Sequence, residues 1–214
     1  VLLIDTEGRV KTFVRRIDIL GGSRNNYVTA KNPLEIPIFS NEEDRNTIEL
    51  VVEHESIDLI IIDSFAGFSN VDENTCQVLQ CLQWLSKIAL KYNCAIVFTQ
   101  LINKGELKEG RITTKSVRGF SGITQWCELI WAVDCPTASD ELKRLYQIKN
   151  NISKKDEKDY IFELKEEGTI TWKDYTNQIK SKKRSRQEIL RDNFEFSNIE
   201  IARLIQEQEP TLKI

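Results

Sequence analysis

Three short apolar runs, each ending at a polar residue, constrain the fold of this chain more than any other feature. The runs cover residues 1–4, 58–62 and 95–99, and Asp5, Asp63 and Gln100 follow them. None of the runs alternates polar and apolar side chains, which is typical of strands whose sheet is covered by helices on both faces. The sequence therefore predicts an α/β fold built on buried parallel strands.

The segments between these runs have helical patterns. A helix is expected up to Leu20, where Gly21-Gly22 stops it, and another over 40–55, where Ser40-Asn41-Glu42-Glu43 has the capping-box pattern. A long helix is expected over 72–93, and a short strand over 36–39. Strand–helix–strand alternation predicts a mainly parallel, right-handed sheet. Four closer runs, over 129–133, 145–149, 160–164 and 169–172, predict an antiparallel C-terminal extension.

Composition excludes several classes of protein. The 214 residues are 40% hydrophobic with a net charge of -3, which argues against a disordered chain. No run approaches the roughly 18 apolar residues of a membrane span, and no signal peptide opens the chain. We therefore expect a cytoplasmic protein without a membrane partner. The five cysteines lack the spacing of a zinc site and are expected to be small buried hydrophobes, and His54 is not expected to be catalytic.

A change in composition near residue 178 predicts a boundary between two regions. Five cations without an acid among them follow it: Lys180, Lys182, Lys183, Arg184 and Arg186. Such a run is either a solvated linker or a nucleic-acid contact. Ser197-Asn198-Ile199-Glu200 then has the pattern of a helix start. Residues 1–178 are expected to form the α/β core, and 179–214 a basic linker with a partial helical, helix-turn-helix-like region.

Ligands of parallel sheets bind outside the carboxyl ends of the strands, where Glu7, Asp63 and Gln100 are expected. An Asp after a buried strand is placed to hold the water shell of a nucleotide-bound Mg²⁺. Glu7 is placed to orient or deprotonate a water that attacks a γ-phosphate, and Gln100 to sense that phosphate. A surface turn or an ordinary polar strand end explains each residue singly. The three together, in this order, favour a nucleotide site.

The segment after Gln100 is long, basic and rich in glycine, as a loop that contacts a nucleic-acid backbone would be. Its candidate DNA-binding residues are Lys104, Lys108, Arg111, Lys115 and Arg118. Glu106 and Glu109 dilute this charge, so an ordinary solvated loop remains an alternative. Lys149 ends a late strand and is either simple strand-end charge or a cation offered to a neighbouring subunit's nucleotide.

The segments Asp5-Thr6-Glu7-Gly8, Ile60-Ile61-Ile62-Asp63-Ser64 and Phe98-Thr99-Gln100 resemble the successive core motifs of RecA-type recombinase and hexameric helicase ATPases. Residues 117–123 and 146–152 further resemble the R-G-S-x-A-I turn and the K-x-N strand end of RepA-like helicases of plasmids, phages and fused primase-helicases. Phe120 and Gly122 depart from the small residues usual in that turn.

The resemblance implies a RecA-like fold and an ATPase that uses ATP and Mg²⁺. By resemblance, Glu7 is the catalytic glutamate, Gln100 the γ-phosphate sensor, and Asp63 with Ser64 the cofactor-binding pair, Asp63 acting on Mg²⁺ through water. Lys149 is the cation that acts across a subunit interface. The implied partners are single-stranded DNA, further copies of the chain in a homo-oligomeric, hexameric ring, and a primase.

No G-x-x-x-x-G-K-[ST] motif occurs in the sequence. Because the phosphate-cradling loop belongs to the strand and helix before Glu7, we expect a core truncated at its N-terminus and inactive by itself. Three alternatives remain open: a RecA-type recombinase or loader, a non-catalytic DNA-binding or scaffold subunit, and a regulatory RecA-like ATPase.

Overall fold

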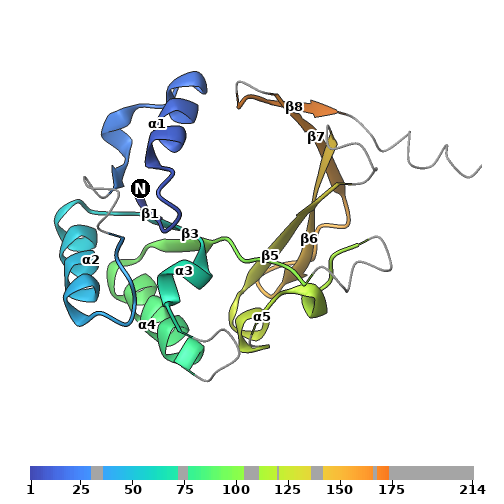
Figure 1. Ribbon diagram of the computed structural model, residues 1–214. Helices are drawn as coiled ribbons and strands as arrows, with labels where there is room; N and C mark the ends of the chain where they lie inside the picture. Colours follow the sequence, from blue (N-terminus) through green and yellow to red (C-terminus); the bar gives the residue numbers. More distant parts are fainter. Residues whose placement is uncertain are drawn as a thin grey trace, which may run out of the picture. The chain divides into compact units, whose positions relative to one another are not determined.

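The computed structural model describes residues 1–29, 36–71, 77–103, 111–119, 121–135, 142–165 and 168–173. Residues Val1–Trp172 form one compact unit. Within the described part of this unit, the strands form one parallel and one antiparallel sheet, each of four strands (Figure 1). The expected boundary at residue 178 and the region 179–214 lie outside the described residues.

The parallel sheet has the strand order β2-β1-β3-β4. Its strands are β1 (Leu2–Asp5), β2 (Val28–Thr29), β3 (Leu59–Asp63) and β4 (Ala95–Phe98). All three neighbouring pairs run parallel, and the register places Asp5 directly opposite Asp63. The three apolar runs of the sequence are therefore adjacent strands, as predicted.

Four helices accompany this sheet in Figure 1: α1 (Val10–Ile19), α2 (Glu42–His54), α3 (Phe65–Ser69) and α4 (Gln77–Tyr92). The predictions of α1, α2 and α4 are confirmed, and residues 72–76 lie outside the description. Asn41, rather than Ser40, caps α2, because its side chain accepts a hydrogen bond from the Glu43 amide at 3.0 Å. The helices bury their apolar faces against β1, β3 and β4, in a core that contains Val52, Ile62 and Leu82.

The expected strand over 36–39 is wrong. The Ile38 amide donates to the Asp44 side chain at 2.9 Å, and the Phe39 amide donates to the Phe68 carbonyl at 2.8 Å. These bonds use the backbone donors that a strand would give to its neighbour. The strand beside β1 is instead β2, whose two residues lie ahead of that segment.

The antiparallel sheet has the order β5-β6-β7-β8 and confirms the predicted extension. Its strands are β5 (Leu129–Asp134), β6 (Leu142–Asn150), β7 (Asp159–Leu164) and β8 (Ile170–Lys173). The short helix α5 (Gly122–Trp126) precedes β5, and single 3-10 turns occur at Arg24–Asn26 and Thr114–Ser116. Their sequences carry no helical periodicity, so these three short elements were not predicted.

Cysteine and histidine behave largely as expected in the described part of the chain. Cys81 and Cys94 are buried, and burial raises the pKa of the Cys81 thiol to about 12. Cys127 is half-buried, Cys135 is exposed, and Cys76 lies outside the description. His54 is exposed, with its Nδ1 3.0 Å from Glu55 Oε1. Among the residues that the structure describes, no helix is long and apolar enough to cross a membrane.

Candidate functional site

The carboxyl ends of β1, β3 and β4 lie side by side and bring the predicted acidic residues to one edge of the parallel sheet. Asp5 and Asp63 are paired in register, and β4 continues into Thr99 and Gln100 on the other side of β3. Because parallel strands all end at the same edge, residues 58 positions apart in sequence become neighbours. The sheet thus assembles the cluster that the sequence analysis expected.

Thr6 ties the end of β1 to the end of β3. Its hydroxyl accepts a hydrogen bond from the Ser64 amide at 2.8 Å and donates to the Asp63 carbonyl at 3.1 Å, while its own amide donates to the same carbonyl at 2.7 Å. A Cβ atom added to Gly67 would lie 2.3 Å from the Thr6 hydroxyl oxygen, so only glycine leaves room for this contact. The peptide bond between Asp63 and Ser64 is cis.

Asp63 is held from the β4 side. The Thr99 hydroxyl donates to Asp63 Oδ1 at 2.6 Å, and the backbone of Thr99 bonds on both sides, to Ile62 and to Phe65. A short hydrogen bond to a carboxylate is strong and fixes its rotamer. One oxygen of Asp63 is thus engaged, and the carboxylate is held in place at the end of the strand.

Glu7 lies one residue beyond this contact and is more exposed. The Glu7 amide donates to Asp5 Oδ1 at 3.0 Å, which fixes the turn after β1, and its carboxylate pairs with Arg9 at 2.8 Å. The Glu7 side chain is 39% exposed. Asp5 therefore places Glu7, although the sequence analysis had assigned Asp5 no role.

Two polar atoms at this edge are buried and have no hydrogen-bond partner among the described residues: Asp5 Oδ2 and Gln100 Oε1. A buried polar atom without a partner is costly unless another group satisfies it. Carboxylate and amide oxygens suit the water shell of Mg²⁺. No group of three metal-ligating side chains occurs in the described part of the chain, which agrees with an ion held mainly by nucleotide phosphates and water.

Gln100 connects this edge to the loop that follows it. Its Nε2 donates to the Arg118 carbonyl at 3.0 Å. The two arms of the loop pair at their base: the Arg118 amide donates to the Leu101 carbonyl at 2.9 Å, and the Asn103 amide to the Ser116 carbonyl at 2.8 Å. The predicted sensor and the predicted DNA loop therefore share a direct hydrogen bond.

The five predicted DNA-binding cations fare differently. Lys104 and Lys108 lie outside the described residues, while Lys115 and Arg118 are exposed on the returning arm. The Arg111 guanidinium makes two hydrogen bonds to the Asp159 carboxylate, at 2.9 and 2.8 Å. DNA contact by these residues stays a prediction.

Lys149 lies near the end of β6, opposite Ile130. Its ammonium donates to the Thr124 carbonyl at 2.9 Å and to the Gln125 carbonyl at 2.8 Å, both on α5. A lysine has three N–H donors, so these two bonds orient it without using its full capacity. Its predicted action across a subunit interface remains a prediction.

Sequence reasoning missed the residues that position the predicted ones. Thr6 and Thr99 supply the hydroxyls that fix Ser64 and Asp63. Both stand beside predicted site residues, within the motifs Asp5-Thr6-Glu7-Gly8 and Phe98-Thr99-Gln100, so adjacency was the available signal.

Comparisons with known proteins agree with this geometry. A family model described as an AAA domain matches residues 1–106. A KaiC-like protein from the hyperthermophilic archaeon Pyrococcus horikoshii OT3 is similar in structure, with TM-score 0.54 and 15% identity over 80% of this chain and 75% of its own. A second solved structure, the ATPase domain of another protein, has TM-score 0.56 and 12% identity, over 79% of this chain and 73% of its own. No curated protein matches the sequence.

A DnaB-like replicative helicase, whose structure was described with its interactions with primase, is also similar, with TM-score 0.56 and 13% identity. The match covers 79% of this chain and 49% of the helicase, so the present chain spans about half of that protein's length. At these identities the likeness shows the fold. The chain has the RecA-like fold of P-loop ATPases, as the resemblance implied.

Proposed function

We propose that this chain is the greater part of the motor domain of an ATP-dependent DNA helicase, of the RepA-like type found in plasmids, phages and mobile elements. The observation that carries the proposal is the hydrogen bond between Gln100 and the Arg118 carbonyl. It joins the edge that carries Asp63 and Glu7 to a basic loop, as an enzyme that converts nucleotide hydrolysis into movement on DNA requires.

In the proposed mechanism, bound Mg²⁺ supplies charge neutralisation at the phosphates of ATP. Asp63, held by Thr99, orients the water shell of the ion, and Ser64 lies beside it at the start of α3. Glu7 takes the proton of the attacking water, a general-base role that suits its exposed carboxylate. Gln100 meets the γ-phosphate through its amide and moves the loop through its bond to Arg118.

A phosphate-cradling loop is also required, and the 214 residues contain no G-x-x-x-x-G-K-[ST] motif. We propose that a strand and helix carrying it complete the core at the edges of β4 and β5. Both strands end their sheets in the described part of the chain and expose apolar side chains, namely Val97, Leu129, Trp131 and Val133. Exposed apolar surface of this extent favours a covering element.

The remaining parts of the proposal concern partners. ATP is hydrolysed between subunits of a hexameric ring, with Lys149 presented by α5 to the neighbouring nucleotide. Lys104, Lys108, Lys115 and Arg118 contact the backbone of single-stranded DNA. The ring works in the cytoplasm, where a primase is a further partner. The DnaB-like helicase and the ATPase domain found in the comparisons support a motor of this class through their shared fold.

The test is the rate of ATP hydrolysis by the complete protein, with the phosphate loop present, measured with and without single-stranded DNA. We expect an activity that single-stranded DNA stimulates and that Asp63→Ala abolishes. Asp58→Ala, at the opposite end of the same strand, is the matched control and should leave the rate unchanged. A rate unaffected by Asp63→Ala would contradict the assigned site.

A recombinase or loader is the second candidate, because Asp5-Thr6-Glu7-Gly8 resembles recombinase motifs as closely as helicase motifs. Electron microscopy of the complete protein with ATP and DNA separates the two functions. Closed rings support the helicase, whereas open helical filaments support the recombinase.

A further inference from the structure

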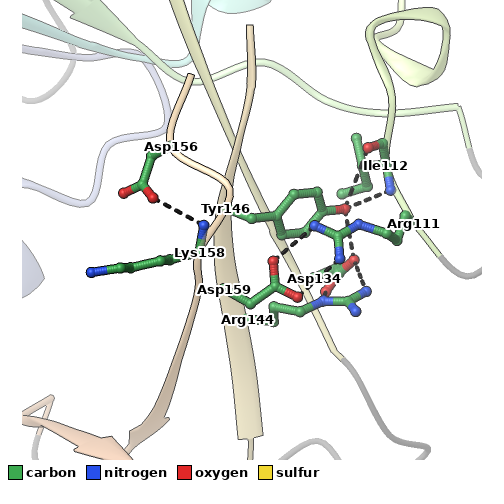
Figure 2. Close-up of polar contacts among 8 residues, drawn as sticks. All are labelled: Arg111, Ile112, Asp134, Arg144, Tyr146, Asp156, Lys158 and Asp159. Atoms are coloured by element: carbon green, nitrogen blue, oxygen red, sulfur yellow. Dashed lines mark hydrogen bonds and ion pairs between the residues drawn. The ribbon is translucent and has the colours of Figure 1, made fainter. Parts of the chain in front are cut away.

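The returning arm of the loop is attached to the antiparallel sheet at Arg111 and Ile112. Figure 2 shows the Arg111 guanidinium facing the Asp159 carboxylate, with hydrogen bonds of 2.9 and 2.8 Å. The guanidinium also lies over the ring of Tyr146, with Cζ 4.2 Å from the ring centroid. A bidentate pair with added cation–π contact fixes both the charge and the plane of an arginine.

Tyr146 forms the second attachment, through its hydroxyl. The Ile112 amide donates to this hydroxyl at 2.6 Å, and the hydroxyl donates to Asp134 Oδ2 at 2.9 Å (Figure 2). Asp134 is held in turn by Arg144, at 2.8 and 2.7 Å. Tyr146 is 2% exposed, and burial raises the pKa of its hydroxyl to about 12, so it stays protonated near neutral pH.

The other attachment of the loop is its paired base at Gln100. Between the two attachments lie only residues 113–117, which form a 3-10 turn closed by the Thr113–Ser116 capping box. Ile112 and Ser116 are both buried. The returning arm is thus held at one end by the antiparallel sheet and at the other by the predicted sensor.

We infer that Arg111, Asp159 and Tyr146 are positioning residues that anchor the DNA-binding loop to the antiparallel sheet, and that Arg111 acts through Asp159 rather than on DNA phosphate. The inference rests on the proposed function in one respect, that this loop meets single-stranded DNA. The anchor gives Gln100 a fixed point against which to move the rest of the loop. DNA contact is then left to Lys115, Arg118 and the lysines at 104 and 108.

Binding of a fluorescent oligo-dT strand to the complete protein, measured over a range of salt concentrations, tests the inference. If Arg111 is an anchor, Arg111→Ala and Asp159→Asn each weaken binding by a similar factor, roughly fivefold, and the double variant weakens it no further. The salt dependence stays that of the wild type. Lys115→Ala is the control, and it should lower the slope of log K against log salt by about 0.7, the value for one phosphate on a single strand.

The inference is overturned if Arg111→Ala lowers the salt slope as Lys115→Ala does while Asp159→Asn leaves binding unchanged or stronger. That result would make Arg111 a phosphate contact. All variants are compared at a temperature where circular dichroism shows them folded, so a loss of affinity is not a loss of structure.

A second measurement needs no DNA and therefore separates failure of the anchor from failure of the proposed function. Tyr146→Phe removes only the hydroxyl that accepts the Ile112 amide. Hydrogen exchange at Ile112 should accelerate at least about tenfold, whereas amides of the β6–β7 ladder keep their protection. Unchanged exchange at Ile112 would contradict the anchor. Wild-type protein that fails to bind DNA but shows this acceleration would contradict the proposed function alone.

Discussion

Gln100 shows how one side chain can serve both the nucleotide and the loop. Its amide nitrogen is engaged by the Arg118 carbonyl, while its amide oxygen is buried without a partner among the described residues. An amide can donate and accept at once, which a carboxylate cannot do. The residue type, and not only its position at the end of β4, therefore matters to the proposed coupling.

Gln100→Glu tests this coupling with almost no change in shape. The new carboxylate cannot donate to the Arg118 carbonyl and is repelled by it, so we expect the ratio of ATPase rates with and without single-stranded DNA to fall to about one. Gln125→Glu makes the same substitution at an exposed position of α5, where only the backbone carbonyl is engaged. It should leave the ratio unchanged. Full stimulation of the Gln100→Glu enzyme would contradict the coupling.

Among the helices and strands, those with a regular apolar pattern were predictable and the others were not. The runs that became β1, β3 and β4 bury side chains on both faces, so their sequences lack polar interruptions. β2 has two residues and no pattern, and the backbone donors of residues 38 and 39 are taken by Asp44 and Phe68. Sequence alone does not reveal such tertiary competition for backbone hydrogen bonds.

The site divides in the same way. Glu7, Asp63 and Gln100 were predictable because strand ends place side chains at a known edge. The anchor was not, because Arg111 and Asp159 are 48 residues apart in sequence and meet only through the antiparallel sheet. A basic residue in a basic loop was therefore predicted as a DNA contact, and its acidic partner was not considered.

The helix α4 provides a test of the core at the level of a single element. Leu82 is 1% exposed and packs in the core, whereas Leu90 on the same helix is 85% exposed. Leu82→Ala should lower the free energy of unfolding by about 2–5 kcal/mol, through lost burial and a residual cavity. Leu90→Ala should change it by less than about 0.5 kcal/mol. Urea denaturation of both variants measures the difference, and equal effects would contradict the described packing.

Across the whole molecule, the two sheets have separate tasks in the proposed enzyme. The parallel sheet supplies Glu7, Asp63 and Gln100, and the antiparallel sheet supplies Lys149 and the residues that hold the loop. The Gln100 bond and the Arg111 pair attach the same loop to both sheets. Hydrolysis at one sheet can therefore be transmitted to DNA through a segment that the other sheet holds in place.

The most direct test of the central claim is a comparison of ATP binding and ATP hydrolysis in the complete wild-type protein and its Glu7→Gln variant. Glutamine keeps the size of the side chain but cannot accept the proton of the attacking water. We predict that Mg-ATP binds both proteins with equal affinity, while the variant hydrolyses it at least about a hundredfold more slowly. Equal hydrolysis rates at equal ATP occupancy would show that Glu7 is not the catalytic base and would contradict the proposed site.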